Sequence, residues 1–146
     1  MTATKSERTD LLFLCVANSA RSQLAEGLAR AMAPEAVGVH SAGSDPGQLH
    51  PLAVEVLAEI NIDISHHHSK AIAAIPTECI ATVITLCDEE VCPILSGDIE
   101  ILHWPLRDPA GARGTEDDAR GRFRDTRDAI QARLRDFFAN SAHRAD

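Results

Sequence analysis

Two residues near the start of the chain, Cys15 and Arg21, have the types and the spacing that can bind and attack an oxyanion. The five residues between them offer backbone N–H groups that can curl around an anion, and the Arg21 guanidinium can donate two parallel hydrogen bonds to it. The same N–H groups and positive charge would keep the Cys15 sulfur as a nucleophilic thiolate near neutral pH. The alternative is an inert, buried cysteine at the end of a strand.

The residues around this segment predict the elements that would position it. The apolar run Leu11 to Leu14 is typical of a strand buried on both faces. From Ser22 onwards, apolar side chains recur at helical spacing until Pro34 ends the helix. A strand, a short loop and a helix N-terminus form anion sites in α/β proteins, because the first N–H groups of a helix have no partner within it. This placement favours the nucleophile over the buried thiol.

The remaining apolar runs predict further strands and helices, joined by loops rich in Gly, Pro or Asp. The expected elements are strands at 37–41, 80–86 and 99–104, a helix from Pro51, a short helix at 71–75, and a final helix after a capping box of Thr115 and Asp118. Because strands and helices alternate, the sequence predicts a three-layer α/β fold with a parallel sheet and right-handed crossovers.

Length and composition place residues 1–146 in a single catalytic domain, with the ends 1–10 and 140–146 expected to be flexible tails. The formal net charge of −8 argues against nucleic-acid and anionic-membrane partners, so an anionic substrate needs a local positive site. No stretch is long and apolar enough to span a membrane, and the polar N-terminus has no signal-peptide core. These features predict a cytoplasmic protein.

Three further cysteines, Cys79, Cys87 and Cys92, lie in the middle of the chain. In a cytoplasmic protein, cysteines are more often catalytic, redox-active or metal-binding than part of a disulfide framework. Structural zinc is disfavoured, because no Cys or His pair downstream of Cys87 and Cys92 completes a set of four ligands. From the residues alone, this pair is either redox-active or incidental. Cys79 is expected to be a buried structural thiol.

The loop sequence CVANSARSQLAEG closely resembles the phosphate-binding loop of the low-molecular-weight tyrosine phosphatase superfamily, and NSxRSQxAEG resembles its thiol-dependent arsenate reductases. The segments SAGSDP, DISHHHS, VITLCDEEVCPIL and HWPLRDPAG match successive reductase segments, so the resemblance covers Leu11 to Phe138. It implies a low-molecular-weight phosphatase-like sandwich with a four-stranded parallel sheet in the order 2-1-3-4. In that order the strands ending at Cys15 and Cys87 are neighbours, and both thiols lie at the carboxyl edge.

The resemblance implies an arsenate reductase with a thiol relay, in which Cys15 attacks arsenate, Arg21 binds it, and Asp108 protonates the departing hydroxide. Cys87 would then attack Cys15 to release arsenite, and Cys92 would attack Cys87, moving the disulfide to where an external thiol donor reduces it. Thioredoxin is the expected donor, and no tightly bound cofactor is expected. The residues expected to bind substrate are Val16, Ala17, Asn18, Ser19, Ala20, Arg21 and Ser22.

The chain departs from the common family pattern inside and outside the loop. Ala17 stands where glycine is usual, and its Cβ is expected to restrict how tightly the amides close on the anion. Ala20 stands where a cysteine is frequent, which removes a competing thiol beside Arg21. The stretch between Cys87 and Cys92 is shorter than usual. Without the resemblance, Asp108 would be interpreted as a turn-forming residue before proline.

Some relatives hold a potassium ion near the loop, and oxygen-bearing residues that match their ligands stand here at Asn18, Glu26, Ser41 and Asp63. Potassium at this place would tighten the loop and raise activity. Each residue also has an ordinary interpretation, as a loop asparagine, a solvated helical glutamate, a strand-end serine and a turn aspartate. Potassium is therefore a hypothesis that rests on the family resemblance.

Other functions are compatible with the same residues. A low-molecular-weight phosphatase acting on small phosphoesters or phosphotyrosine needs Cys15, Arg21 and Asp108 but no second thiol. The absence of Tyr and the single Trp count against a phosphotyrosine substrate. A reductase that uses glutathione and a glutaredoxin-type partner, or another low-molecular-weight thiol, would depend less on Cys92. A non-enzymatic alternative is an anion-binding or redox-sensing module.

Overall fold

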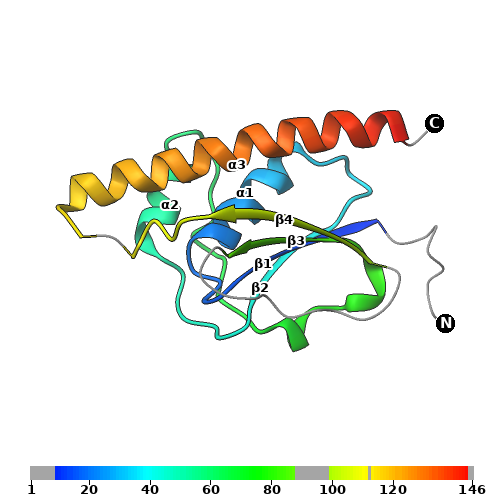
Figure 1. The fold of residues 1–146 in the computed structure, drawn as a ribbon, viewed down its shortest axis with the longest axis horizontal. Helices are drawn as coiled ribbons and strands as arrows, with labels where there is room; N and C mark the ends of the chain where they lie inside the picture. The colour runs from blue at the N-terminus through cyan, green and yellow to red at the C-terminus, as the bar shows by residue number, and fades with distance from the viewer. Residues whose placement is uncertain (1–8, 88–98, 112, 145–146) are drawn as a thin grey trace.

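The structure, a computed structural model, describes residues 9–87, 99–111 and 113–144. Its central sheet consists of β1 (Asp10–Cys15), β2 (Val39–Gly43), β3 (Ile80–Cys87) and β4 (Glu100–Leu106), as Figure 1 shows. The strand order is β2-β1-β3-β4, and all three pairings are parallel. The predicted sheet and its order are therefore confirmed, and β1 has a neighbour on each side.

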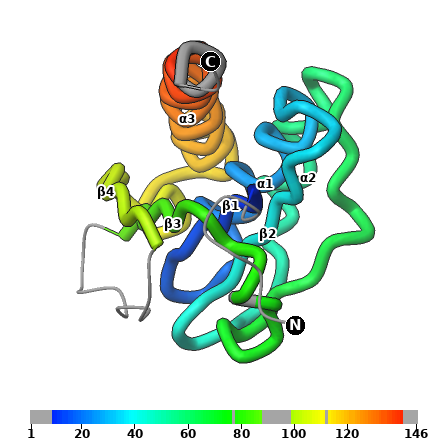
Figure 2. The backbone as a smooth tube through the Cα atoms, turned by 90° about the vertical axis from the view of Figure 1, so that its right-hand side faces the viewer, coloured from blue at the N-terminus to red at the C-terminus, as the bar shows by residue number. Residues whose placement is uncertain are grey.

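The helices α1 (Arg21–Met32), α2 (Pro51–Ala58) and α3 (Glu116–Arg144) pack on one face of the sheet (Figure 2). The opposite face is covered by the segment that carries two 3₁₀ turns, η2 (Ile72–Ala74) and η3 (Thr77–Cys79). The third layer of the sandwich is therefore thin. A short helix was expected at 71–75, but Pro76 follows immediately and limits the segment to 3₁₀ turns.

The two faces of β1 belong to two separate apolar clusters. Leu11 and Phe13 pack with residues of the three α-helices, including Leu24 and Phe123. Leu12, Leu14 and other side chains of the opposite face pack against Ile75 and Val83. Side chains alternate between the faces of a strand, so a strand covered on both sides is apolar throughout. This burial holds Cys15, the last residue of β1, in a rigid position.

The bounds of β2 and β4 differ from the predicted ones by two residues at one end or at both, whereas β1 and β3 extend the predicted runs by one residue at one end or at both. β2 covers Val39–Gly43 instead of 37–41, because its register is set by pairing with β1, where Leu11 lies opposite Val39. β4 covers Glu100–Leu106 and continues through Pro105 beyond the predicted end at 104. β4 is an edge strand, where a residue without an N–H group costs no ladder hydrogen bond on the open side.

Cys79 is exposed, so the prediction of a buried structural thiol is wrong. The residue lies in η3, one position before β3, and the burial begins with Ile80. The apolar pattern of a strand predicts the burial of its members but gives no information on the residue that precedes them.

Regular structure extends into both segments that were expected to be tails. β1 begins at Asp10, whose carboxylate accepts a hydrogen bond from the Gly38 N–H at 3.0 Å and lies 3.0 Å from His40 Nε2. At the other end, α3 continues to Arg144. Residues 1–8 and 145–146 lie outside the described part of the chain.

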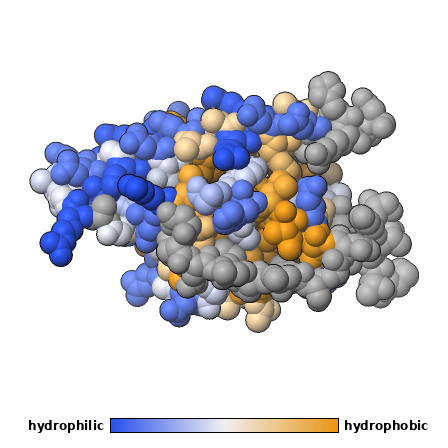
Figure 3. Space-filling view, in the orientation of Figure 1, coloured by the Kyte–Doolittle hydropathy of each residue, from blue (hydrophilic) through white to orange (hydrophobic). Residues whose placement is uncertain are grey.

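The described surface is polar over much of its area. Among the described residues no helix has the length and apolar character needed to cross a membrane. Apolar side chains are visible beside the strands in Figure 3, and Ile101 on β4 is 46% exposed. Exposure of a single large apolar side chain on an edge strand is ordinary for a globular protein.

The predicted capping box at the start of α3 is confirmed. The Thr115 N–H donates to Asp118 Oδ2 at 3.1 Å, and the Asp118 N–H donates to Thr115 Oγ1 at 3.1 Å. Hydrogen bonding of the carboxylate with the backbone and the side chain of Thr115 lowers the pKa of the Asp118 carboxyl, because it favours the ionised form. The cap fixes the start of the helix that covers α1 and α2.

We expect Thr115→Ala to lower the free energy of unfolding by about 1 kcal/mol, because the substitution leaves the Asp118 N–H without its side-chain acceptor. Urea denaturation followed by circular dichroism measures the difference. Thr115→Ser retains the hydroxyl and is the matched control. Equal midpoints for the alanine variant and the wild type would contradict this role of the cap.

Candidate active site

The candidate site is a cavity of about 240 Å³ at the carboxyl edge of the sheet. Cys15 ends β1 on one side of it and Arg21 begins α1 on the other. The residues that line it are Cys15, Val16, Ala17, Ser19, Ala20, Arg21 and Asp108. The structure thus brings together the predicted nucleophile, the predicted guanidinium and the predicted acid, although Asp108 is separated from the loop by more than eighty residues.

The loop between Cys15 and Arg21 is held through its carbonyl groups. The carbonyl oxygens of Val16, Ala17 and Ser19 accept hydrogen bonds from backbone N–H groups within residues 45–50, at 2.9, 2.9 and 3.0 Å. In a trans peptide the N–H and C=O groups point in opposite directions, so the N–H groups of the following residues point away from that segment. This arrangement presents backbone donors on the other side of the loop, as anion binding requires.

The end of β2 and the start of α1 complete this backbone arrangement. A Cβ atom at Gly43 would lie 2.4 Å from the Val16 carbonyl oxygen and 2.9 Å from the Asn18 nitrogen, so only glycine permits this approach. α1 has no side-chain cap at Ala20. α1 begins at Arg21 beside the cavity, where the positive end of the helix dipole favours an anion.

Two buried polar side chains, Asn18 and Ser22, form a chain of hydrogen bonds that leads to the Cys15 sulfur. Asn18 Nδ2 donates a hydrogen bond to Ser22 Oγ at 2.7 Å, and Ser22 Oγ lies 2.8 Å from Cys15 Sγ. Because the Ser22 oxygen already accepts from Asn18, its hydroxyl hydrogen can be donated to the sulfur. A hydrogen bond to the ionised form stabilises a thiolate. Asn18 and Ser22 therefore lie behind the cavity and support the nucleophile, although both were predicted to bind substrate.

Arg21 and Asp108 approach the cavity from different elements. The Arg21 guanidinium is buried and donates from Nη1 to the Leu106 carbonyl oxygen at 2.9 Å, which links the loop to the end of β4. Asp108 is exposed, and its Oδ1 accepts from the Ala110 N–H at 3.0 Å. Burial lowers the pKa of the His50 imidazole, the Asp108 carboxylate raises it, and burial prevails. His50 is therefore neutral at pH 7 and adds no charge beside Asp108.

Cys87 is a buried cysteine at the end of β3, the strand next to β1. The register places Leu14 opposite Thr85, so Cys15 and Cys87 end neighbouring parallel strands at the same edge of the sheet. Cys87 is not among the residues that line the cavity. Cys92 lies outside the described residues.

Three polar residues that the sequence analysis missed hold Asn18. Gln23 Nε2 donates to the carbonyl oxygen and to Oδ1 of Asn18, both at 3.2 Å. Ser69 Oγ donates to the same carbonyl oxygen at 2.7 Å, and the Lys70 N–H donates to Asn18 Oδ1 at 3.0 Å. They keep Asn18 buried with a φ of 51°, in the left-handed region. The sequence signal that could have indicated this support is Gln23, a polar residue on the buried side of α1.

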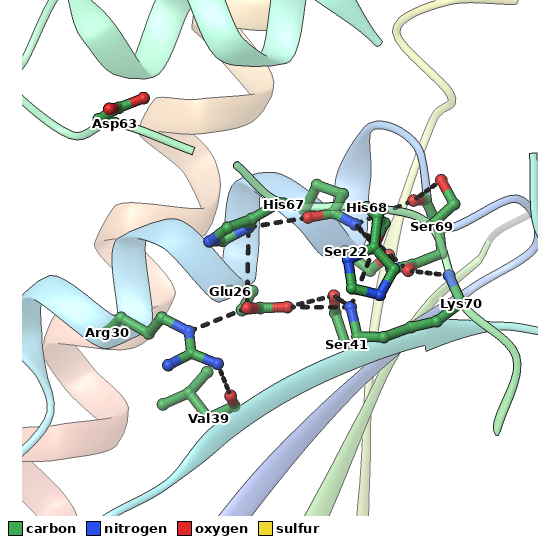
Figure 4. A network of polar contacts seen from close by, with 12 residues as sticks. Ser22, Glu26, Arg30, Val39, Ser41, Asp63, His67, His68, Ser69 and Lys70 are labelled. Carbon is green, nitrogen blue, oxygen red and sulfur yellow. Dashed lines mark hydrogen bonds and ion pairs between the residues drawn. The ribbon is translucent and has the colours of Figure 1, made fainter. Parts of the chain in front are cut away.

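The predicted potassium ligands are only partly brought together. Glu26 and Ser41 are buried and hydrogen-bonded to each other at 2.5 Å. Asp63 lies apart from this pair in Figure 4, and its Oδ1 accepts from the Ser65 N–H at 2.8 Å. Asp63 therefore does not lie beside the Glu26–Ser41 pair. The described residues include no group of three or more His, Cys, Asp or Glu side chains that could hold a metal ion.

The fold, with Cys15 and Arg21 at the two ends of a loop at the carboxyl edge of the sheet, is that of a phosphatase-like protein. Residues 10–145 match the family described as low molecular weight phosphotyrosine protein phosphatase. The arsenate reductase of Bacillus subtilis strain 168 is 38% identical over 133 residues, which are 90% of this chain and 96% of that protein. Arsenate reductase 2 of Staphylococcus saprophyticus is 35% identical over 136 residues, which are 92% of this chain and 99% of that protein. The chain therefore belongs to this phosphatase family.

Solved structures agree with this assignment. An arsenate reductase in the phosphate binding state has a TM-score of 0.77 and is 29% identical, with 90% of this chain and 98% of that chain covered. A thioredoxin-dependent arsenate reductase of Corynebacterium glutamicum has a TM-score of 0.73 and is 29% identical. The match covers 94% of this chain and 63% of that chain. The named relatives within the family are arsenate reductases.

We expect Ser22→Ala to slow alkylation of Cys15 by iodoacetamide at pH 7 on the order of 10-fold. The reason is that the thiolate loses the hydrogen bond from Ser22, and hydrogen bonds to a charged acceptor are stronger than those to a neutral one. Mass spectrometry of the Cys15 peptide measures the rate separately from the exposed Cys79. Ser22→Thr keeps the hydroxyl and serves as the control. A rate equal to that of the wild type would contradict the support of the thiolate by Ser22.

Proposed function

We propose that this protein is an arsenate reductase that converts arsenate to arsenite in the cytoplasm. The observation that carries the proposal is the combination of two thiols at one sheet edge: Cys15 in the anion-binding loop and Cys87 at the end of the neighbouring strand. A phosphatase needs only the first thiol. The arsenate reductases among the relatives, at 35–38% identity over nearly the whole chain, support the same activity.

In the proposed reaction, the loop N–H groups and Arg21 bind arsenate through its oxygens. The Cys15 thiolate forms a sulfur–arsenic bond while one arsenic–oxygen bond breaks. Asp108 gives its proton to the departing hydroxide, which leaves as water. The negative charge that develops on the oxyanion is stabilised by donors that the fold has already oriented.

The thiols would then supply two electrons. The Cys87 thiolate attacks the Cys15 sulfur, and the sulfur–arsenic bond breaks. The electron pair of that bond remains on arsenic, which is reduced from arsenic(V) to arsenic(III) and leaves as arsenite. The product is a Cys15–Cys87 disulfide. Cys92 attacks Cys87 in this disulfide, which frees Cys15 and forms a Cys87–Cys92 disulfide for an external dithiol to reduce. Thioredoxin is the proposed donor, supported by the thioredoxin-dependent relative.

Phosphate-ester hydrolysis is the second candidate function, because the family match and the cavity with Cys15, Arg21 and Asp108 favour it. One comparison separates the two functions and the donors. Arsenate-dependent NADPH oxidation is measured with thioredoxin and its reductase, then with glutathione and glutaredoxin, and release of phosphate from an aryl phosphate is measured in parallel. Turnover of the aryl phosphate alone would assign the protein to the phosphatases.

We expect Cys87→Ser to abolish multiple turnover in the thioredoxin assay while Cys15 still reacts once with arsenate, because no second thiol can displace arsenic from the adduct. Cys15→Ser should abolish both steps. Cys79→Ser is the matched control, since Cys79 is exposed and absent from the cavity lining. Wild-type turnover by Cys87→Ser would contradict the relay.

We expect Asp108→Asn to slow formation of the first disulfide by about 10²- to 10⁴-fold, because the departing hydroxide loses its proton donor. The rate is measured in a single turnover without an external thiol, by acid quenching and mass spectrometry of the disulfide. Asp125→Asn, an exposed residue of α3, is the control. An unchanged single-turnover rate would show that another group supplies the proton.

A further inference from the structure

A buried carboxylate lies behind the anion-binding loop, and an ammonium group lies beside it. Glu26 on α1 is 4% exposed. Its Oε1 accepts a hydrogen bond from Ser41 Oγ at 2.5 Å, and its Oε2 accepts from Arg30 Nε at 2.9 Å. Lys70 Nζ lies 3.5 Å from Oε1, and His67 Nδ1 lies 3.7 Å from Oε2 (Figure 4). Four groups that can donate hydrogen bonds thus surround one acid.

The Lys70 ammonium has oxygen neighbours of the kinds that bind metal cations. Besides Glu26 Oε1, they are Ser41 Oγ at 3.4 Å and the carbonyl oxygen of His68 at 3.3 Å. A carboxylate, a hydroxyl and a carbonyl are typical ligands of hard cations. The chain has two lysines among its 14 basic residues. At this position it carries the compact point charge of an ammonium rather than a planar guanidinium.

Potassium does not fit this set of residues. Its predicted ligands include Glu26 and Ser41, whose oxygens the Lys70 ammonium already contacts, and a second cation there would be repelled by the first. Asp63, the remaining predicted carboxylate, lies apart. The positive charge that potassium would bring is already supplied by the chain itself.

Lys70 also contacts the loop directly. Its backbone N–H donates to Asn18 Oδ1 at 3.0 Å, and Asn18 in turn donates to Ser22, which lies 2.8 Å from Cys15 Sγ. An ammonium that holds residues 68–70 against Glu26 therefore also holds the backbone N–H donor that orients Asn18. The path from Lys70 to the nucleophile therefore consists of hydrogen bonds between buried or half-buried groups.

We propose that Lys70 is a positioning residue whose ammonium replaces a bound monovalent cation, so that oxyanion binding in the loop is independent of potassium. The inference rests on the proposed oxyanion site, although it does not require that arsenate is reduced. This role differs from that of a surface ion pair: if the charge of Lys70 is removed, the protein requires a free cation in its place.

The charges around Glu26 agree with this role. Burial raises the pKa of the Glu26 carboxyl, but the Ser41 hydrogen bond, the charge of Lys70 and the Arg30 hydrogen bond lower it below its ordinary value. Burial lowers the pKa of the His67 imidazole more than Glu26 raises it, so His67 is neutral at pH 7. Among the described groups facing Glu26, Lys70 and Arg30 carry the charge, and the Arg30 side chain is 54% exposed.

The test uses the full chain and inorganic phosphate as the probe. Binding is measured by calorimetry in potassium chloride and in tetramethylammonium chloride at equal ionic strength. The wild type should bind equally in both salts. Lys70→Gln should bind phosphate about 10-fold more weakly in tetramethylammonium, and potassium should restore most of the affinity. Lys70→Arg retains the charge and should remain independent of potassium.

Potassium dependence of the wild type would overturn the inference, and so would equal binding by Lys70→Gln in both salts. The midpoint of thermal unfolding, measured in the same salts, provides a second readout: potassium should raise it for Lys70→Gln but not for the wild type. Lys70→Met is a second neutral variant, and failure of both to fold even in potassium would also overturn the inference. If the wild type binds no phosphate, the oxyanion site itself fails, while the unfolding midpoints still decide the role of Lys70.

Discussion

A loop that is to bind an anion through its backbone, as we propose for the loop between Cys15 and Arg21, must direct its N–H groups toward the ligand, and the surrounding structure meets this constraint. Such a loop cannot use those N–H groups to hold its own shape, although buried backbone groups need partners. Here the carbonyl groups receive their partners from residues 45–50 instead. Asn18 adopts the left-handed conformation, and only glycine fits at position 43. The loop is therefore shaped by segments outside it.

This external support explains why so many polar side chains are buried behind the loop. The buried polar residues of α1 and of its neighbours at the loop are Asn18, Arg21, Ser22, Gln23, Glu26 and Ser41. Each of them makes a hydrogen bond to another residue. A polar network whose members are all paired is rigid, whereas an unpaired member would be costly. The network thus keeps the Cys15 sulfur in one position relative to the loop.

The parallel pairing of β1 and β3 determines where the Cys87 thiol lies relative to Cys15. β1 and β3 run in the same direction and are neighbours, so Cys15 and Cys87 end at the same edge, where antiparallel strands would have placed them at opposite ends. The formal net charge of −8 attracts no anion to the protein as a whole. Arg21, the start of α1 and the backbone donors of the loop therefore supply a local positive field.

The sequence by itself determined the local elements and the loop chemistry, because helical spacing, the capping box and the Cys15–Arg21 spacing all reflect interactions between residues close in the chain. The resemblance to a known family supplied the sheet order. Only the tertiary structure placed Lys70 beside Glu26, set Asp63 apart and left Cys79 exposed. Such contacts join residues far apart in the chain, and they depend on how segments cross, which no local pattern encodes.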